Sequence, residues 1–292
     1  MKIGIADMVS NFVPGSGNPL GMDTSTWHLF EPAQRLELVL DIISQSNFDY
    51  LELGVPWING TNDHPSFDLV ASIIKDRNLV VGSYCSMVPG NFKTVGIDIE
   101  WDTLKRYINM VFANCNKLGG NVIVYGSGAS RTIPNNYSRS LAEQDMVSFL
   151  QLMSDVINEN NYPFKIAIEP LNTRECNYIN SLDEADRLVR KVGSSNIGIV
   201  VDTFHAYLQK NNFLDELSAV MENVIHIHVS QPEDRGWPGH LQQSGLFDFI
   251  EFFKTINSSN YKGNVTVECN FNNLKSEINT CKDFLDNVCF VH

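Results

Sequence analysis

Eight short apolar segments recur along this chain of 292 residues, and a stretch with helical patterning follows each of them. The segments are rich in β-branched residues, nearly continuous in apolar character and too short to be helices. Such runs are typical of parallel strands that are buried on both faces of a sheet. The predicted strands are Lys2–Met8, Tyr50–Val55, Val80–Met87, Asn121–Gly126, Lys165–Leu171, Ile197–Thr203, Val224–Ser230 and Asn264–Asn270.

The helical stretches complete a repeating unit of strand and helix. Gly119 follows a predicted helix end at Leu118, and Ser181 precedes Glu184 by three residues, which is a capping-box pattern. Eight strands that alternate with eight helices predict an α/β fold, a single closed (β/α)₈ TIM barrel that spans residues 1–292 as one domain. The predicted helices are Gln34–Asn47, Ser66–Arg77, Trp101–Leu118, Leu141–Asn160, Leu182–Val192, Asn212–Glu222, Leu246–Ile256 and Asn273–Val288.

The composition narrows the class of protein. Hydrophobic residues make up 43% of the chain and charged residues 19%, which is sufficient for a large core. The formal net charge of −13 disfavours a nucleic-acid partner, because such binding rests on Lys and Arg that neutralise phosphates. No apolar run reaches the roughly 18 residues of a membrane span, and the N-terminal segment Met1–Ala6 reads as a strand rather than as a signal peptide. We therefore expect a cytoplasmic protein that binds neither nucleic acid nor membrane.

Residues that can bind a metal stand at the carboxyl ends of the last four predicted strands. They are Glu169, Asp202, His228 and Glu268. Because strand ends converge on one mouth of a barrel, these side chains should be neighbours. Three carboxylates and an imidazole would repel and desolvate one another unless a cation balanced them. An oxygen-rich set with one nitrogen suits Mn²⁺, Mg²⁺ or Co²⁺ better than a structural zinc, which favours sulfur and nitrogen.

Further candidates for the mouth lie near the second strand. Glu52 ends this strand and is expected to bind a substrate hydroxyl or to cap the next segment. Trp57 follows and either stacks on a sugar face or packs in the core. His226, two residues before His228, is expected to be a hydrogen-bonded core residue. The long segment Ser10–Glu31 follows the first strand, and we expect it to help to select the substrate, because such loops build the active sites of barrels.

Four short motifs resemble those of a known superfamily. The motifs are Glu169–Asn172 (EPLN), Asp202–His205 (DTFH), His226–Val229 (HIHV) and Val267–Glu268. They resemble the sugar isomerase/epimerase superfamily of xylose-isomerase-like TIM barrels. The likeness is closest to the D-tagatose and D-psicose 3-epimerase group and to hydroxypyruvate isomerases. It extends over nearly the whole chain, because all eight strands follow in the expected order.

The resemblance implies a divalent-metal-dependent isomerase or epimerase that acts through an enediolate on a small sugar or sugar phosphate. The four residues named above would hold one metal ion, with Mn²⁺ expected and Mg²⁺, Co²⁺ or Zn²⁺ as alternatives. Glu169 and Glu268 would also be the acid and base on opposite faces of the substrate. Return of the proton to the same carbon gives epimerisation, and return to the neighbouring carbon gives isomerisation. Analogy to the same group implies a homodimer.

The resemblance also implies three substrate contacts. Glu175 follows the EPLN motif by a short step, and His205 closes the DTFH motif. Arg235 lies in the loop after the seventh strand, where the spacing departs from the usual pattern. These side chains would hold the oxygens of the sugar.

Three alternatives share this barrel or its site. A dehydratase of the inosose or dehydroshikimate type uses the same metal and proton abstraction and then expels water, and the sequence leaves it open. An endonuclease IV-like DNA-repair nuclease shares the Asp202–His205 pattern. It needs additional histidines after the middle strands, where this chain has Ser83–Ser86 and Tyr125–Ser127, and an Asp-x-His segment that is missing after Ser230. A non-enzymatic sugar-binding protein would suit an incomplete metal site, whereas all four positions are filled.

Overall fold

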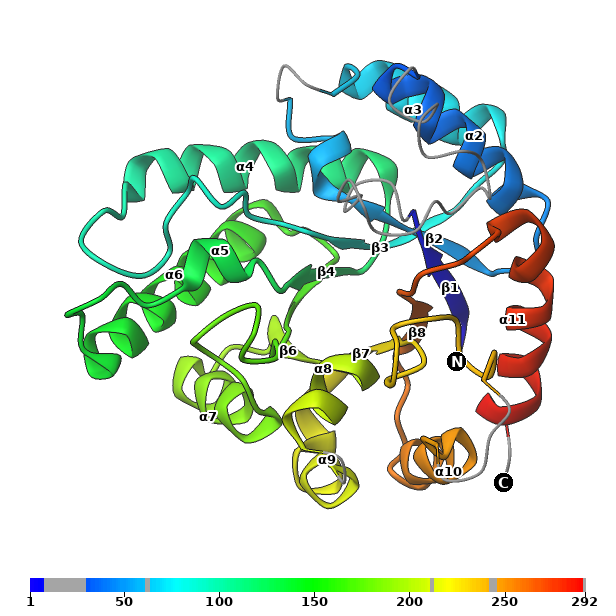
Figure 1. Cartoon of the computed structure of the whole chain (residues 1–292). Coiled ribbons are helices and arrows are strands. Elements are labelled where there is room, and N and C mark those ends of the chain that lie inside the picture. The colour runs from blue at the N-terminus through cyan, green and yellow to red at the C-terminus, as the bar shows by residue number, and fades with distance from the viewer. Residues whose placement is uncertain (8–29, 61–63, 211–212, 242–245, 291–292) are drawn as a thin grey trace.

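Eight parallel strands close into a barrel in this computed structural model, which describes residues 1–7, 30–60, 64–210, 213–241 and 246–290 (Figure 1). Each strand pairs with the next along the chain, and β8 pairs with β1. The predicted fold is therefore confirmed. The strands are β1 Ile3–Ala6, β2 Tyr50–Gly54, β3 Val81–Cys85, β4 Val122–Tyr125, β5 Lys165–Ile168, β6 Ile197–Asp202, β7 Val224–Val229 and β8 Asn264–Val267.

The helices pack around the outside of the barrel (Figure 1). No helix in the described part of the chain combines the length and apolar character needed to cross a bilayer. The helices are α2 Pro32–Ser44, α3 Phe67–Asp76, α4 Trp101–Leu118, α5 Gly128–Arg131, α6 Arg139–Asn160, α7 Leu182–Val192, α8 Thr203–Gln209, α9 Leu214–Val220, α10 Phe249–Ser258 and α11 Leu274–Cys289, with 3₁₀ turns at Val55–Trp57 and Met221–Asn223.

Local capping signals set several of these boundaries. Gly119 ends α4 with a φ of 95°, a conformation that favours glycine because it has no Cβ. At the start of α7, the Ser181 hydroxyl accepts a hydrogen bond from the backbone N–H of Glu184, as the capping pattern predicts. The Glu184 carboxylate, however, accepts from the backbone N–H of Asn180 and not from that of Ser181. The reciprocal half of the capping box therefore lies one residue earlier than predicted.

The alternation of side chains along the strands separates two buried regions. The main core fills the space between strands and helices and includes Leu51, Ile168 and Val201. A small separate cluster inside the barrel consists of Cys85, Val122, Val124, Ala167 and Val200. Successive strand residues point to opposite faces, so every second residue of a strand points into the barrel.

Candidate metal centre

The inward-pointing positions at the carboxyl end of the barrel carry the predicted metal ligands. Glu169 directly follows β5, Asp202 is the last residue of β6, His228 is the next-to-last residue of β7, and Glu268 directly follows β8. Each side chain points to the same face of its strand as the residue two positions earlier, which lies inside the barrel. Asp202 and Val200 are one such pair. The two-residue repeat of a strand therefore places all four side chains at the same mouth of the barrel.

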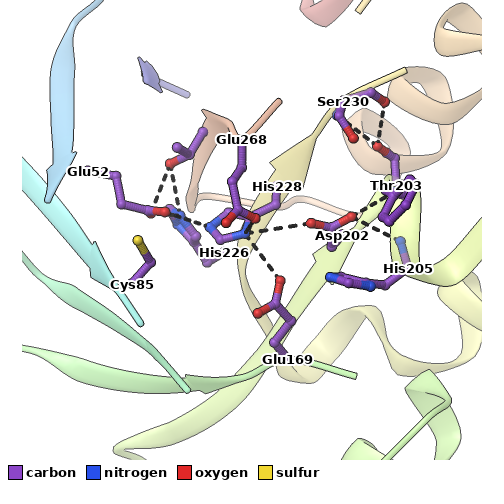
Figure 2. A network of polar contacts seen from close by, with 12 residues as sticks. Glu52, Cys85, Glu169, Asp202, Thr203, His205, His226, His228, Ser230 and Glu268 are labelled. Carbon is purple, nitrogen blue, oxygen red and sulfur yellow. Dashed lines mark hydrogen bonds and ion pairs between the residues drawn. The ribbon is translucent and has the colours of Figure 1, made fainter. Parts of the chain in front are cut away.

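The three carboxylates meet around the imidazole of His228 (Figure 2). One ligand atom from each of Glu169, Asp202, His228 and Glu268 lies within 4.8 Å of the others. Nδ1 of His228 is 3.1 Å from Glu268 Oε2, 3.4 Å from Glu169 Oε1 and 3.8 Å from Asp202 Oδ2. The arrangement offers three carboxylate oxygens and one imidazole nitrogen to a common centre.

This donor set fits a divalent cation. Glu169 Oε1, His228 Nδ1 and Glu268 Oε2 are buried and have no hydrogen-bond partner among the described residues. Buried polar atoms normally have one, and a metal ion is one group that satisfies such atoms. Oxygen donors with a single nitrogen are typical of Mn²⁺ and related hard cations.

Electrostatics also favour a positive charge at this centre. Burial, together with the carboxylates of Glu169 and Glu268, raises the pKa of Asp202 to about 8. Burial alone would lower the pKa of His228, but the carboxylates of Glu52 and Glu268 raise it well above its usual range. Burial raises the pKa of Glu268, but the charge of His228 outweighs this effect and lowers it to about 2. In the absence of a metal, bound protons therefore have to balance the carboxylates.

Asp202 holds its position through the helix that follows it. Its Oδ1 accepts hydrogen bonds from the backbone N–H groups of Phe204 at 2.7 Å and His205 at 3.1 Å, which makes it the N-cap of α8. Oδ2 remains directed at the metal centre. Asp202 is thus a helix cap through one oxygen and a candidate metal ligand through the other.

Glu169 is held by the loop after β4. Arg131 is fully buried, and its guanidinium donates to the backbone oxygens of Glu169 at 2.6 Å and Tyr125 at 3.2 Å. Gly126 leaves room for the carboxylate, because a Cβ at this position would lie 2.2 Å from Glu169 Oε2. Arg131 and Gly126 were not among the predicted metal ligands or substrate contacts, and their roles depend on contacts across the barrel.

A layer of polar side chains lies beneath the centre. Glu52 is 0% exposed and contacts His226 and His228 (Figure 2). It also accepts hydrogen bonds from the hydroxyls of Ser83 and Thr266. Burial raises the pKa of Glu52, but His228 and His226 lower it well below its usual range. This placement favours a supporting role for Glu52 over the expected contact with a substrate hydroxyl. The prediction of His226 as a hydrogen-bonded core residue is confirmed.

The three predicted substrate contacts lie beside the centre. Nδ1 of His205 accepts from the Asn172 side-chain amide at 2.8 Å and lies 3.3 Å from the Asn172 backbone nitrogen, so this network assigns the ring proton to Nε2. Burial and the charge of Arg235 lower the pKa of His205 to about 4, so the ring is neutral at pH 7. Arg235 lies 3.6 Å from both Glu175 and Glu268. Asn172, which also donates to Glu175, is a further site residue that its motif position indicated.

Trp57 and the segment Ser10–Glu31 are the other two features that were expected at the mouth. Trp57 is 2% exposed and belongs to the main core, which favours core packing over contact with a substrate. Most of the segment Ser10–Glu31 lies outside the described residues.

The fold and the site together define a class, a (β/α)₈ barrel with a candidate divalent-metal centre at the carboxyl ends of its last four strands. Residues 40–284 match the family described as the xylose isomerase-like TIM barrel. The chain belongs to this family.

Curated relatives carry the names of isomerases and epimerases. The 3-dehydro-D-guloside 4-epimerase of Escherichia coli (strain K12) is 26% identical over 235 residues, which cover 77% of this chain and 84% of the relative. The inosose isomerase of Halalkalibacterium halodurans is 27% identical over 140 residues, which cover 44% of this chain and 47% of the relative. The chain thus spans about half the length of this second relative.

Solved structures show the same fold over their whole length. The 3-keto-D-glucoside 4-epimerase of E. coli is 20% identical with a TM-score of 0.73, and the match covers 98% of this chain and 99% of that one. A D-psicose 3-epimerase studied in the presence of D-fructose is 17% identical with a TM-score of 0.75, and the match covers 99% of each chain. At these identities the likeness establishes the fold.

Proposed function

We propose that this protein is a divalent-metal-dependent ketose epimerase or isomerase that transfers a proton next to a carbonyl. The observation that carries the proposal is the cluster of Glu169, Asp202, His228 and Glu268, whose ligand atoms lie within 4.8 Å of one another. The names of the relatives support the reaction class. A bound cation would supply positive charge that stabilises negative charge as it develops on the substrate oxygens.

The exposure of the four side chains suggests how they divide the work. The side chains of Glu169 and Glu268 are 9% and 13% exposed, whereas those of Asp202 and His228 are 2% and 0% exposed. Only a residue that reaches the mouth can exchange a proton with a substrate. We therefore assign the acid and base roles to the two glutamates and a purely ligating role to Asp202 and His228.

The proton transfers balance within the pair of glutamates. One carboxylate takes the proton from the carbon next to the carbonyl, and the electron pair of that C–H bond forms a C=C bond while the carbonyl oxygen becomes negative. The other glutamate, protonated, returns a proton to the opposite face of the same carbon, which inverts the centre. Proton exchange with water then restores both carboxyl groups. A positioned acid or base of this kind typically contributes about 10²–10⁴-fold in rate.

The mouth favours an uncharged sugar over a sugar phosphate. Glu169, Asp202, Glu268 and Glu175 bring four carboxylates to this region, and the guanidinium of Arg235 is already shared between two of them. A phosphate would add like charge at short range. We propose that the neutral His205 donates its Nε2 proton to a sugar oxygen and that Arg235 holds a second one.

Two finer assignments complete the proposal. We propose Mn²⁺ as the cation, because the donor set is rich in oxygen and contains one imidazole. The homodimer, which rests on analogy alone, stays a prediction.

Exchange with solvent deuterium tests the reaction class. The Mn²⁺-loaded protein is incubated in D₂O with ketoses, ketose phosphates and hydroxypyruvate, and each reaction is followed by NMR. We expect deuterium at the carbon next to the carbonyl of an uncharged ketose, and inversion at that carbon would identify an epimerase. Loss of water from a cyclic polyol ketone or from dehydroshikimate, without exchange in the ketoses, would favour the dehydratase instead.

Two substitutions test the catalytic pair. Glu169→Gln and Glu268→Gln should each lower the rate of proton transfer by about 10²–10⁴-fold, because an amide cannot accept the proton. Glu251→Gln, on an exposed position of α10, is the control and should retain full activity. Near-normal turnover in the Glu268→Gln variant would refute the assignment.

A further inference from the structure

Glu52 is the carboxylate on the far side of His228 from the metal centre. It lies in the middle of β2, and 0% of its side chain is exposed. One of its oxygens, Oε1, is 2.9 Å from Nε2 of His228. The opposite ring nitrogen, Nδ1, faces the three ligand carboxylates (Figure 2). The imidazole therefore lies between Glu52 and the centre.

Hydrogen bonds to the second oxygen fix the orientation of the Glu52 carboxylate. Its Oε2 accepts from the Ser83 hydroxyl at 2.6 Å, lies 2.9 Å from Nε2 of His226 and accepts from the Thr266 hydroxyl at 3.2 Å. The Thr266 hydroxyl also contacts the hydroxyl of Tyr50 at 2.7 Å. Four different strands thus contribute to one buried network. A carboxylate held this firmly through one oxygen has the other oxygen directed at His228.

A second metal site is a poorer explanation of the same residues. Glu52, His226 and His228 could in principle hold an ion, because their ligand atoms also lie within 4.8 Å of one another. However, with Nδ1 on the first cation, Nε2 of His228 binds a second ion only if the ring loses its proton and bridges both ions, and Ser83 and Thr266 already donate to Glu52 Oε2. His226 Nε2 is engaged by the same oxygen. The set is therefore better suited to support the first centre than to bind another ion.

The position of Glu52 determines which nitrogen of His228 can bind a metal. A carboxylate within ion-pair distance of Nε2 favours a proton on that nitrogen, which leaves the lone pair of a neutral imidazole on Nδ1. The negative charge also increases the basicity of the ring. Metal-binding histidines commonly donate their other N–H to a carboxylate, and Glu52 is the carboxylate nearest to Nε2 of His228.

We infer that Glu52 is a positioning residue that holds His228 with its proton on Nε2 and its Nδ1 lone pair directed at the cation. This inference rests on the proposed metal centre. It differs from the expectation that Glu52 binds the substrate, because a side chain that is 0% exposed beneath His228 is screened from the mouth. Glu52 acts only through the ring that it orients.

The substitution Glu52→Gln tests the inference, because it keeps the shape of the side chain and removes its charge. Whichever way the amide turns, its NH₂ group meets N–H or O–H donors, either at His228 or at Ser83 and His226. We expect the Mn²⁺ dissociation constant, measured by calorimetric titration of the metal-stripped protein, to rise about 10–100-fold.

A matched control separates this effect from a general loss of stability. Asp186, 8% exposed on α7, accepts hydrogen bonds from Arg190 and Asn223 away from the mouth. Asp186→Asn should lower the thermal stability and leave the Mn²⁺ affinity within threefold of the original protein. An affinity within threefold for Glu52→Gln, or an equal loss in both variants, would overturn the inference. Failure of the unaltered protein to bind Mn²⁺ would instead refute the metal centre on which the inference depends.

A measurement on the unaltered protein decides the matter if Glu52→Gln does not fold. In the Co²⁺-loaded protein, the single imidazole ligand should give one strongly shifted N–H proton resonance in the NMR spectrum. We expect this proton to be close to the ring proton on Cδ2, which identifies Nε2–H, and to exchange slowly with D₂O. Proximity to the β-protons would identify Nδ1–H and overturn the inference.

Discussion

At the scale of single residues, several side chains serve local structure and the proposed chemistry together. Asp202 caps α8 with one oxygen and offers the other to the metal centre. His205 is oriented by Asn172 so that Nε2 carries its proton. Such residues are expected where a site is built on the ends of regular elements, because the backbone there still has unsatisfied N–H groups.

The substitution Asp202→Asn separates the two roles of Asp202, helix cap and metal ligand. Asparagine caps helices about as well as aspartate, so Asp202→Asn should leave the stability of the metal-stripped protein unchanged or increase it, since a repelled charge is removed. The same variant should bind Mn²⁺ at least about tenfold more weakly, because a charged ligand is lost. Calorimetry and thermal unfolding measure the two effects.

Asp202→Ala provides the control for this substitution. It removes the cap as well as the ligand and should be about 1 kcal/mol less stable than Asp202→Asn in the metal-stripped protein. An Asp202→Asn variant with unchanged Mn²⁺ affinity would exclude Asp202 as a ligand.

At the scale of elements, a side chain at the end of one strand restricts which residue can stand at the end of the neighbouring strand. Gly126 follows β4, and Glu169 follows the neighbouring β5. The carboxylate of Glu169 occupies the space in which a side chain at position 126 would begin. Position 126 therefore requires glycine, because a larger residue would clash with a side chain 43 residues away in the sequence.

Gly126→Ala should displace the carboxylate of Glu169, because the new Cβ would lie 2.2 Å from its Oε2. The end of a side chain can move, so we expect the barrel to fold. Turnover should fall about 10²-fold, the usual effect of a misplacement near 1 Å. Gly90→Ala is a matched control, because its Cβ would approach that of Ala129 at 2.8 Å without touching a ligand. Equal turnover in the two variants would contradict this role of Gly126.

At the scale of the whole molecule, the buried titratable groups make stability depend on pH and metal together. The raised pKa values of Asp202 and His228 mean that the folded, metal-stripped protein holds protons that the unfolded chain has released. Burial lowers the pKa values of His205 and His226, which favours the folded state as pH rises to about 6.5. Above pH 6.5 only the protons retained by Asp202 and His228 still change the stability at this site. The metal-stripped protein should therefore lose stability as pH rises from 6.5 to about 8.

A bound cation removes this dependence, because it takes the place of the retained protons. The difference in unfolding free energy between the Mn²⁺-loaded and metal-stripped protein should therefore grow between pH 6.5 and 8, by at most about 1.4 kcal/mol per pH unit for each retained proton. Chemical denaturation at several pH values with a fixed free Mn²⁺ concentration measures it. A difference that shrinks with pH would show that the cation binds elsewhere.

The sequence by itself determined the elements and the approximate content of the site. Hydrophobic periodicity and capping residues act over a few neighbours, so helices such as Trp101–Leu118 and Leu182–Val192 begin and end where predicted. Parallel strands also have a fixed direction, so the carboxyl ends had to meet. For this reason Glu169, Asp202, His228 and Glu268 could be expected together before any coordinates were known.

Only the tertiary structure decided how these groups are oriented and what supports them. Glu52 and His228 are 176 residues apart, and their contact depends on the closure and register of the barrel. The space beside Gly126, the burial of Arg131 and the core position of Trp57 follow equally from packing between distant segments. Sequence patterns report which face a residue occupies. The direction of a ring nitrogen or a carboxylate oxygen is set by neighbours that the fold alone brings together.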